Sequence, residues 1–361
     1  MFVKSIDLLN FRNYKNETIS FSDGVNIVHG KNAQGKTNLV ESLYLLSCAK
    51  SFKTSKDVEM ILHGEKHATI SANIQKDYGI LNLKCELKNN ENKNFYINNT
   101  KLSKISDIFG NLCIIFFSPD ELCLVKGSPQ DRRNFMDTDI SQISSVYYEI
   151  LNRFEKVLIN RNKLLKTKDE SKILQSIDVW DEQFAFYASK IVITRKKFIS
   201  KILEPARNNL QYLTENKEEL SLEYDGVNGE DEKEIRENIL KSLKRTLKAS
   251  IEVGFTLIGP QRDDIIIKIN GQEVKNFGSQ GQARSVVLAL KLAELEIFEK
   301  ELREKPVLVL DDVFSEIDAK RKQKLLQKIQ GSQTIITCVS NRFSKNANYN
   351  FIKIVEGKKN W

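Results

Sequence analysis

The sequence predicts an α/β fold in which a sheet-containing domain is interrupted by an inserted, mainly helical second domain. Short apolar runs separated by turns fill the first hundred residues and return after about residue 251, which is the pattern of strands. Between about residues 131 and 247 the apolar side chains recur at helical spacing instead. We therefore expect residues 1–120 and 250–361 to form one domain and residues 121–249 to form the insertion.

The first domain is expected to begin with strands and one early helix. Strands are predicted at residues 2–8, 25–29, 68–74, 80–87 and 95–97. The helix follows a glycine-bearing turn and runs from about Lys36 through Leu46.

The central segment is predicted to be a set of packed helices. One apolar stripe runs over residues 150–165 and another over residues 180–202. Both are too short for a long antiparallel coiled coil, which needs many unbroken heptads. Residues 223–232 are polar, acidic and interrupted by glycine, so we expect a solvated loop before a last helix.

The last hundred residues are predicted to contain buried parallel strands. Residues 307–310 and 334–339 are β-branched, apolar runs without alternation, as a sheet covered on both faces requires. A long helix between Gln280 and Glu301 precedes the first of these strands.

The composition and the first residues indicate a globular protein that stays where it is made. Of its 361 residues 40% are hydrophobic, and the mean hydropathy is −0.39. No apolar run approaches the roughly 20 residues that a membrane helix needs. The first residues, Met1 to Asp7, lack the basic and then apolar layout of a secretory signal. We therefore expect no membrane partner.

The net charge of +8 and the isoelectric point of about 9.0 suit a polyanionic partner, because lysines and arginines neutralise phosphates. Many basic proteins bind no nucleic acid. Net charge by itself therefore leaves the partner open.

Cysteine and histidine do not indicate a metal centre. The five cysteines are odd in number and never spaced as Cys-x-x-Cys, so neither a disulfide framework nor a zinc site is expected. Buried thiols are the simpler interpretation. His29, His63 and His67 are the only histidines, and we interpret each as structural or surface.

One motif specifies a phosphate-binding loop. Residues 30–37 fit the pattern G-x-x-x-x-G-K-[ST] between a strand and a helix. The glycines let backbone N–H groups face phosphates, and the helix amino terminus adds positive potential. Lys36 is expected to act in catalysis by reaching the β and γ phosphates of ATP, and Thr37 to ligate Mg²⁺. The predicted ATP-binding residues here are Gly30, Lys31, Asn32, Ala33, Gln34, Gly35, Lys36, Thr37 and Asn38.

A second motif follows the buried run at 307–310, which ends in Asp311 and Asp312. An acid at the carboxyl end of a parallel strand beside the loop strand is where a Walker B aspartate belongs. We predict Asp311 as a metal residue and Asp312 as the catalytic group that polarises the attacking water. A solvated aspartate pair at a strand end is the alternative interpretation.

A third motif lies about twenty-five residues before the Walker B strand. Residues 277–284, Phe-Gly-Ser-Gln-Gly-Gln-Ala-Arg, resemble the signature of ATP-binding cassette proteins. Ser315 to Asp318 resembles the D-loop of that class, with Ser315 and Asp318 as its candidate residues. The resemblance implies an ATP-binding cassette type P-loop ATPase head, in which the signature of one subunit caps ATP held by another. The residues implied to act in trans are Ser279, Gln280, Gly281 and Gln282.

Such a turn before a helix is otherwise an ordinary helix cap. Physically, Ser279 and the helix amino terminus offer hydroxyl and backbone donors to a γ-phosphate.

Within this class the chain is similar to the RecF family of bacterial recombination and repair proteins. The further blocks that carry the resemblance are 9–14, 38–41, 49–54, 117–120, 124–127, 132–133 and 259–264. The resemblance is weakest between about residues 139 and 253, where only the helical character carries over.

The resemblance implies a cytoplasmic DNA-binding ATPase of recombinational repair, replication restart and the SOS response. ATP and Mg²⁺ are its implied cofactors, and slow hydrolysis serves as a switch for an ATP-dependent homodimer. The implied partners are single-stranded and duplex DNA at gap junctions, RecR and RecO, and indirectly RecA. Arg12 resembles a residue that touches nucleotide in related heads; a solvent-facing arginine in a turn is its alternative.

Some residues depart from these patterns. Gln261 stands where the family usually has histidine. No glutamine follows the strand at 113–117, and no histidine follows the strand at 334–339, as a transporter cassette would have. The γ-phosphate contacts from those two loops are expected to differ or be absent, which suits slow hydrolysis.

Two alternative functions remain. A transporter nucleotide-binding subunit normally has a much shorter segment between loop and signature than the roughly 240 residues here. An SMC-like head with a structural DNA role is the second, and the missing coiled coil counts against it.

Two groups of cations are candidate phosphate contacts. One is the pair Arg132 and Arg133, and the other is the basic helix with Lys241, Lys244, Arg245 and Lys248. A solvated charged face is the alternative for both.

Overall fold

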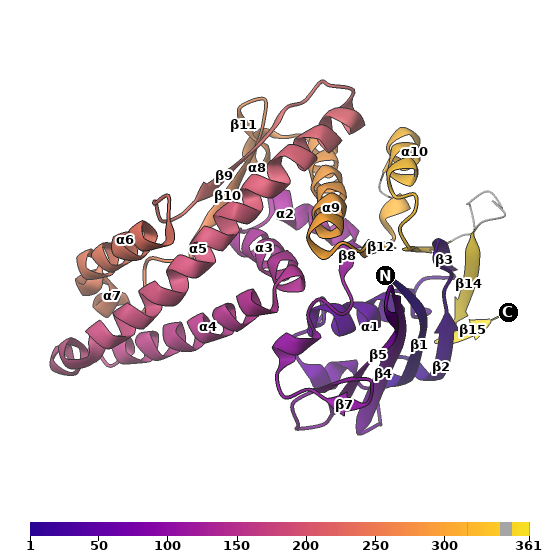
Figure 1. The fold of residues 1–361 in the computed structure, drawn as a ribbon, viewed down its shortest axis with the longest axis horizontal. Helices are drawn as coiled ribbons and strands as arrows, with labels where there is room; N and C mark the ends of the chain where they lie inside the picture. Colours follow the sequence, from indigo (N-terminus) through magenta and orange to yellow (C-terminus); the bar gives the residue numbers. More distant parts are fainter. Residues whose placement is uncertain (316, 340–348, 361) are drawn as a thin grey trace. The chain divides into compact units, whose positions relative to one another are not determined.

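The computed structural model describes residues 1–315, 317–339 and 349–360, and the chain divides into two compact units (Figure 1). The first unit is Met1–Glu121 with Leu288–Trp361, and the second is Leu122–Val287. The start of the insertion lies within a residue of the expected position. Its end differs from the expected residue 249, because residues 250–287 group with the inserted unit.

A strand pairing accounts for this difference. β10 (Asp264–Ile269) pairs antiparallel with β9 (Leu220–Asp225) of the insertion, and β11 (Gln272–Glu273) extends the same small sheet. Residues 223–225, expected in a loop, are therefore the end of a strand, and only residues 226–231 connect it to the next helix. Strand pairing across about forty residues leaves no local signal in the sequence.

The first unit contains an antiparallel sheet in the order β2-β1-β4-β5-β6-β7. Residues in β4 and β5 alternate between buried and half-buried positions, because one face of the sheet is covered. The strands are β1 (Phe2–Phe11), β2 (Tyr14–Ser20), β4 (His67–Lys76), β5 (Gly79–Lys88), β6 (Asn94–Ile97) and β7 (Thr100–Lys101).

A second sheet of this unit has the order β15-β14-β3-β13-β12-β8, and its strands from β14 to β8 run parallel. Every residue of β12 and β13 is buried, which explains why these runs do not alternate. The strands are β3 (Val25–His29), β8 (Ile114–Phe117), β12 (Val307–Asp311), β13 (Thr334–Cys338), β14 (Asn350–Val355) and β15 (Lys358–Asn360).

Helix α1 (Lys36–Cys48) contacts β4 and β5 of the antiparallel sheet and β8 and β12 of the parallel one. It is buried nearly all round, so it lacks the polar face of a surface helix. The first unit also holds α10 (Ala319–Lys328), and the boundary between the units falls inside α9 (Gln280–Leu302).

The second unit is mainly helical, as predicted. Its α4 (Ser145–Lys166) packs along α5 (Glu170–Thr214), with the fully buried Arg161 paired to Asp181 at 2.7 Å between them (Figure 1). The other helices are α2 (Cys123–Lys126), α3 (Pro129–Ile143), α6 (Glu232–Arg245), α7 (Leu247–Val253) and α8 (Val274–Phe277).

Within the part of the chain that the structure describes, no helix is both long enough and apolar enough to cross a membrane. None of the five cysteines forms a disulfide, and all but Cys123 are buried.

Candidate nucleotide-binding site

The carboxyl ends of β3, β12 and β13 border a pocket of about 400 Å³ in the first unit. Crevices at this end of a parallel sheet are where such folds bind ligands. The pocket brings together the loop motif and the Walker B acids, which are about 270 residues apart in the chain. It is lined by Asn32, Ala33, Gly35, Lys36, Thr37, Asn38, Lys53, Asp311, Asp312, Thr337 and Val339.

The loop between β3 and α1 requires glycine at two positions. A Cβ atom on Gly30 would lie 2.3 Å from the carbonyl oxygen of Ile354, and one on Gly35 would lie 2.8 Å from Nδ2 of Asn13. Gly35 also has φ 113°, a conformation that favours glycine. The same Asn13 side chain donates to the carbonyl oxygen of Gln34 at 3.1 Å. The turn after β1 thus fixes the curl of the loop.

Lys36 lies at the loop with its ammonium turned inward. Its Nζ donates to the carbonyl oxygens of Gly30 and Lys31, each at 2.8 Å, so these two residues shape the loop without lining the pocket. Burial lowers the pKa of Lys36, and the charges of Asp312 and Asp311 oppose that shift. Because phosphate oxygens accept stronger hydrogen bonds than neutral carbonyls, this ammonium is well placed to transfer to a phosphate.

Asp311 meets two hydroxyl groups. The Thr37 hydroxyl donates to its Oδ1 at 3.3 Å and the Thr337 hydroxyl donates to the same atom at 2.6 Å. Burial raises the pKa of Asp311, while the hydrogen bonds from Thr337 and Thr37 oppose the rise. Hydroxyl and carboxylate oxygens are the ligands that Mg²⁺ prefers. The oxygen atoms that Thr37 and Asp311 offer therefore suit the Mg²⁺ site predicted at these two residues.

Asp312 lies at the rim of the same pocket with an exposed side chain. Its backbone has φ 55°, in the left-handed region that few residues other than glycine adopt. The Thr337 hydroxyl accepts a hydrogen bond from its N–H at 3.0 Å. One threonine of β13 thus positions both acids, since the parallel register sets Asp311 opposite Thr337.

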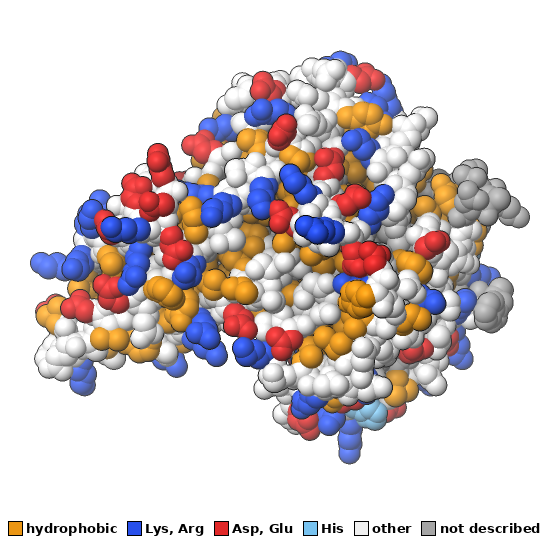
Figure 2. All heavy atoms as spheres, viewed as in Figure 1, with side chains coloured by type: hydrophobic (Ala, Val, Ile, Leu, Met, Phe, Trp, Pro, Cys, Tyr) orange, Lys and Arg blue, Asp and Glu red, His pale blue; other side chains and the backbone are white. Residues whose placement is uncertain are grey.

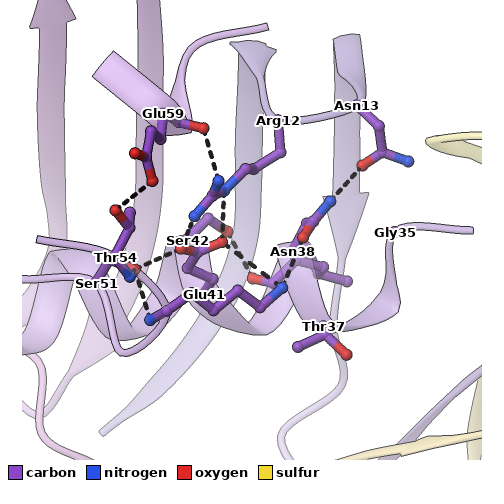
Figure 3. A network of polar contacts seen from close by, with 12 residues as sticks. Arg12, Asn13, Gly35, Thr37, Asn38, Glu41, Ser42, Ser51, Thr54 and Glu59 are labelled. Carbon is purple, nitrogen blue, oxygen red and sulfur yellow. Dashed lines mark hydrogen bonds and ion pairs between the residues drawn. The ribbon is translucent and has the colours of Figure 1, made fainter. Parts of the chain in front are cut away.

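Arg12 is engaged by a buried glutamate of α1. Its Nε and one terminal nitrogen donate to the Glu41 carboxylate at 2.8 and 2.5 Å, and its other nitrogen donates to the carbonyl oxygen of Glu59 (Figure 3). Arg12 itself does not line the pocket; beside Lys36 the lining cation is Lys53, whose Nζ donates to Oδ1 of Asn38 at 2.8 Å and lies 3.8 Å from Glu41. The structure therefore joins Arg12 to the pocket through Glu41 and Lys53.

The signature motif forms a tight cap at the start of α9. The Ser279 Oγ accepts from the Gln282 N–H at 3.1 Å, and the Ser279 N–H donates to the Gln282 side chain at 2.9 Å. Lys126 fixes the turn before it, because its ammonium donates to the carbonyl oxygens of Val274, Lys275 and Gly278 at 2.8, 3.1 and 2.6 Å.

The D-loop candidates Ser315 and Asp318 each form a hydrogen bond with a backbone group three residues away. The Ser315 hydroxyl donates to the carbonyl oxygen of Asp312 at 2.7 Å. Asp318 caps α10 by accepting from the Arg321 N–H at 2.9 Å. Glu316, between them, lies outside the described residues.

The two groups of candidate phosphate contacts differ in exposure. Arg132 and Arg133 are 2% and 9% exposed, and Arg132 forms a bidentate pair with Asp264 at 2.6 and 2.9 Å. Arg133 donates to the carbonyl oxygen of Asp263. A phosphate-binding role for this pair is wrong, because both guanidinium groups serve the core of the second unit. Lys241, Lys244, Arg245 and Lys248 are all exposed.

Lys53, Thr337 and Asn13 lie at the site, but no motif in the sequence predicted a role for them. Thr337 had a signal, since it is a hydroxyl residue inside an otherwise apolar buried strand. Lys53 and Asn13 lie inside segments that resembled family blocks, but no motif assigns them chemistry.

The chain is similar to known proteins over nearly its whole length. The chain matches the family described as RecF/RecN/SMC N terminal domain over residues 2–360. It is 42% identical to the DNA replication and repair protein RecF of Alkaliphilus oremlandii over 341 residues, which cover 93% of each chain. It is 39% identical to the protein of the same name from Lachnoclostridium phytofermentans, over 99% of each chain.

Solved structures give the same result. The recombination mediator protein RecF with ATP in the RecFOR pathway has a TM-score of 0.93 and 35% identity, covering 99% of this chain and 97% of that one. An Smc head bound to the C-winged helix domain of ScpA has a TM-score of 0.59 at 15% identity, a likeness of fold alone. These similarities confirm the predicted α/β fold of a P-loop ATPase head.

Proposed function

Because the chain belongs to the RecF family of DNA replication and repair proteins, we propose that it is an ATP-binding ATPase of recombinational repair. The observation that carries this proposal is the pocket in which Lys36 and Thr37 of the loop lie opposite Asp311 and Asp312. A lysine, a hydroxyl and a strand-end acid around one pocket are the parts that phosphoryl transfer needs.

In this proposal the loop N–H groups and Lys36 bind the β and γ phosphates, and Thr37 with Asp311 holds Mg²⁺. Bound Mg²⁺ neutralises charge that develops on the transferred phosphoryl group. Asp312, exposed at the rim, accepts a hydrogen bond from the attacking water and orients it. Thr337 supports this step by fixing the backbone of Asp312.

The signature residues are proposed to act on the ATP of a second copy of the chain. The capping arrangement leaves the Ser279 hydroxyl with its own proton to donate, because its oxygen serves the Gln282 N–H as an acceptor. That hydroxyl and the first N–H groups of α9 then cap a γ-phosphate and stabilise an ATP-dependent homodimer. Hydrolysis is slow and ends the dimeric state.

DNA at gaps or junctions between single-stranded and duplex segments is the proposed nucleic-acid partner. RecR and RecO, and indirectly RecA, are the proposed protein partners, and the cytoplasm is the proposed location. The similarity to a mediator of the RecFOR pathway and the net charge of +8 support these partners.

Binding of duplex, single-stranded and gapped DNA by the pure protein, with and without ATP, tests the proposal. We expect ATP to strengthen binding to the duplex-containing substrates. A protein that binds ATP but none of the three DNA substrates contradicts the repair function and leaves the nucleotide site standing.

A further inference from the structure

A hollow of about 640 Å³ opens in the second unit, between α6 and the segment at residues 257–263. Two of its cations, Lys241 and Arg245, come from α6, and the third, Arg262, comes from that segment. All three side chains are exposed. Lys244 and Lys248, which are close to them in sequence, do not line the hollow.

The three cations have no ion-pair partner among the residues that the structure describes. Arg236, on the same helix, shows the contrast, since it pairs with Glu182 at 2.8 Å. Arg262 is held in place by the ring of Phe255, 5.1 Å from the guanidinium carbon. Lys and Arg side chains lie among acidic ones over the region of α6 and α7 (Figure 2), so the net charge of the hollow depends on which groups face it.

The lining residues of α6 form one stripe of donors. Asn238, Lys241, Ser242 and Arg245 lie at positions i, i+3, i+4 and i+7, which places them on one face over about 10 Å. The neighbouring stripe of Ile235, Ile239 and Leu243 is buried and anchors the helix. The donors therefore keep a fixed direction toward the hollow.

Asp263 is the only acid among the described residues that line the hollow, and its charge is directed inward. It is 5% exposed, and its carboxylate accepts a hydrogen bond from the Tyr224 hydroxyl. The buried Arg133 donates to the backbone carbonyl oxygen of Asp263 at 2.8 Å. The face that a ligand meets is therefore cationic.

We propose that this hollow binds the phosphodiester backbone of DNA, through Lys241, Arg245 and Arg262. The inference rests on the proposed DNA function and adds the surface that carries it. Guanidinium and ammonium groups interspersed with the neutral donors of Asn238 and Ser242 suit phosphate oxygens. No aromatic side chain is among the described lining residues, so the contact reads the backbone and no base is stacked.

The test is the salt dependence of binding to a duplex oligonucleotide in the presence of a slowly hydrolysed ATP analogue. One variant carries Lys241→Gln, Arg245→Gln and Arg262→Gln. A charge-matched control carries Lys233→Gln, Lys244→Gln and Lys248→Gln, which removes three exposed cations of the same region that do not line the hollow. Far-ultraviolet circular dichroism and ATP titration check that both variants fold and bind nucleotide.

Each lost phosphate contact should make the slope of log affinity against log salt shallower by about 0.9, hence by about 2 to 3 per subunit for the hollow variant. The control should keep the slope of the parent. Equal changes in the two variants, or a parental slope in the hollow variant, overturn the inference. If the triple variant is unfolded, Lys241→Gln alone decides between the same outcomes, with an expected change of about 0.9.

Two further results separate this inference from the function on which it rests. A parent that binds no duplex with the analogue contradicts the DNA function itself, and the hollow then has no DNA to bind. Poly-glutamate serves as a probe for an acidic protein partner. If the hollow variant loses poly-glutamate binding but keeps the parental DNA slope, the hollow binds an acidic polypeptide and our assignment is wrong.

Discussion

Arg132→Met should destabilise the second unit because it breaks a buried ion pair. The Arg132 side chain is 3% exposed, and besides its two bonds to Asp264 it donates to the carbonyl oxygens of Leu124 and Gly127. Removing one partner of a buried pair costs about 3 to 5 kcal/mol. The Asp264 side chain is 22% exposed, so water can partly rehydrate it, and we expect the lower end, about 3 kcal/mol.

Urea unfolding followed by Trp180 fluorescence is the assay, since Trp180 lies in α5 of the second unit. A Trp361→Phe background removes the other tryptophan of the chain. With an unfolding slope of about 2 kcal/mol per molar urea, the midpoint should fall by about 1.5 M. Arg236→Met is the matched control. Its partner Glu182 is exposed, so its loss should cost about 1 kcal/mol or less.

The loss of stability in Arg132→Met should become smaller as the pH is lowered. Burial acts to raise the pKa of Asp264, but the hydrogen bond and charge of Arg132 outweigh burial. The pKa of Asp264 is therefore below its ordinary value of 3.8. When folding lowers the pKa of an acid, its ionised form stabilises the fold at pH values above its pKa in the unfolded chain. This contribution is lost as the pH falls through the pKa that the acid has in the folded protein. The difference between parent and variant should be largest at neutral pH and shrink below about pH 4.

Two results refute this reasoning. An unchanged midpoint in Arg132→Met shows that the pair carries no stability. A normal midpoint together with a shallower salt dependence of DNA binding shows that Arg132 contacts phosphate after all.

Six substitutions at five residues test the nucleotide site and the proposed ATP-dependent dimer. Lys36→Met should lower ATP affinity by about tenfold or more without changing stability, because a charged hydrogen-bond donor to phosphate is lost. Calorimetric titration measures the affinity, and an unchanged value contradicts the assignment of the loop. Ser279→Arg should leave ATP binding to the monomer intact and block the ATP-induced dimer in sedimentation with a slowly hydrolysed analogue; a normal dimer removes the composite site. Lys126→Met should weaken the affinity of that dimer by roughly tenfold, since three carbonyl oxygens at the signature turn lose their donor. Lys126→Arg should retain part of the affinity, and equal affinities of the two variants exclude a positioning role for Lys126. Asp312→Asn should trap the ATP-bound dimer with slow turnover, whereas Asp311→Ala should raise the Mg²⁺ requirement; parental turnover in Asp312→Asn excludes it from the hydrolytic step.

The parts that the sequence predicts well are those with local causes. The loop at 30–37 needs glycines, a lysine and a hydroxyl at fixed spacing, and these requirements are visible within eight residues. Buried parallel strands are equally local, since full burial selects a continuous apolar run. The strand at 307–311 and its two acids are therefore found where they are predicted.

The parts that it misses depend on contacts between distant segments. Arg132 looks like a surface cation in the sequence because its partner Asp264 lies 132 residues away. Thr337 becomes a site residue only because β13 pairs in register beside β12. The predicted end of the insertion is wrong for the same reason, since β10 joins the inserted unit by pairing with β9. Long-range register is decided by the packing of the whole unit.

The order of strands in the parallel sheet has a consequence for synthesis of the chain. β3, which carries the phosphate-binding loop, is flanked by β13 and β14, both from the last thirty residues of the chain. Because β3 is synthesised some 300 residues before both neighbours, it cannot complete its pairing until they have been made. The insertion at 122–287 is continuous and can fold earlier. Closure of the parallel sheet across some 300 residues should therefore be the slow step, and a nascent chain that stops before Thr334 should not retain nucleotide.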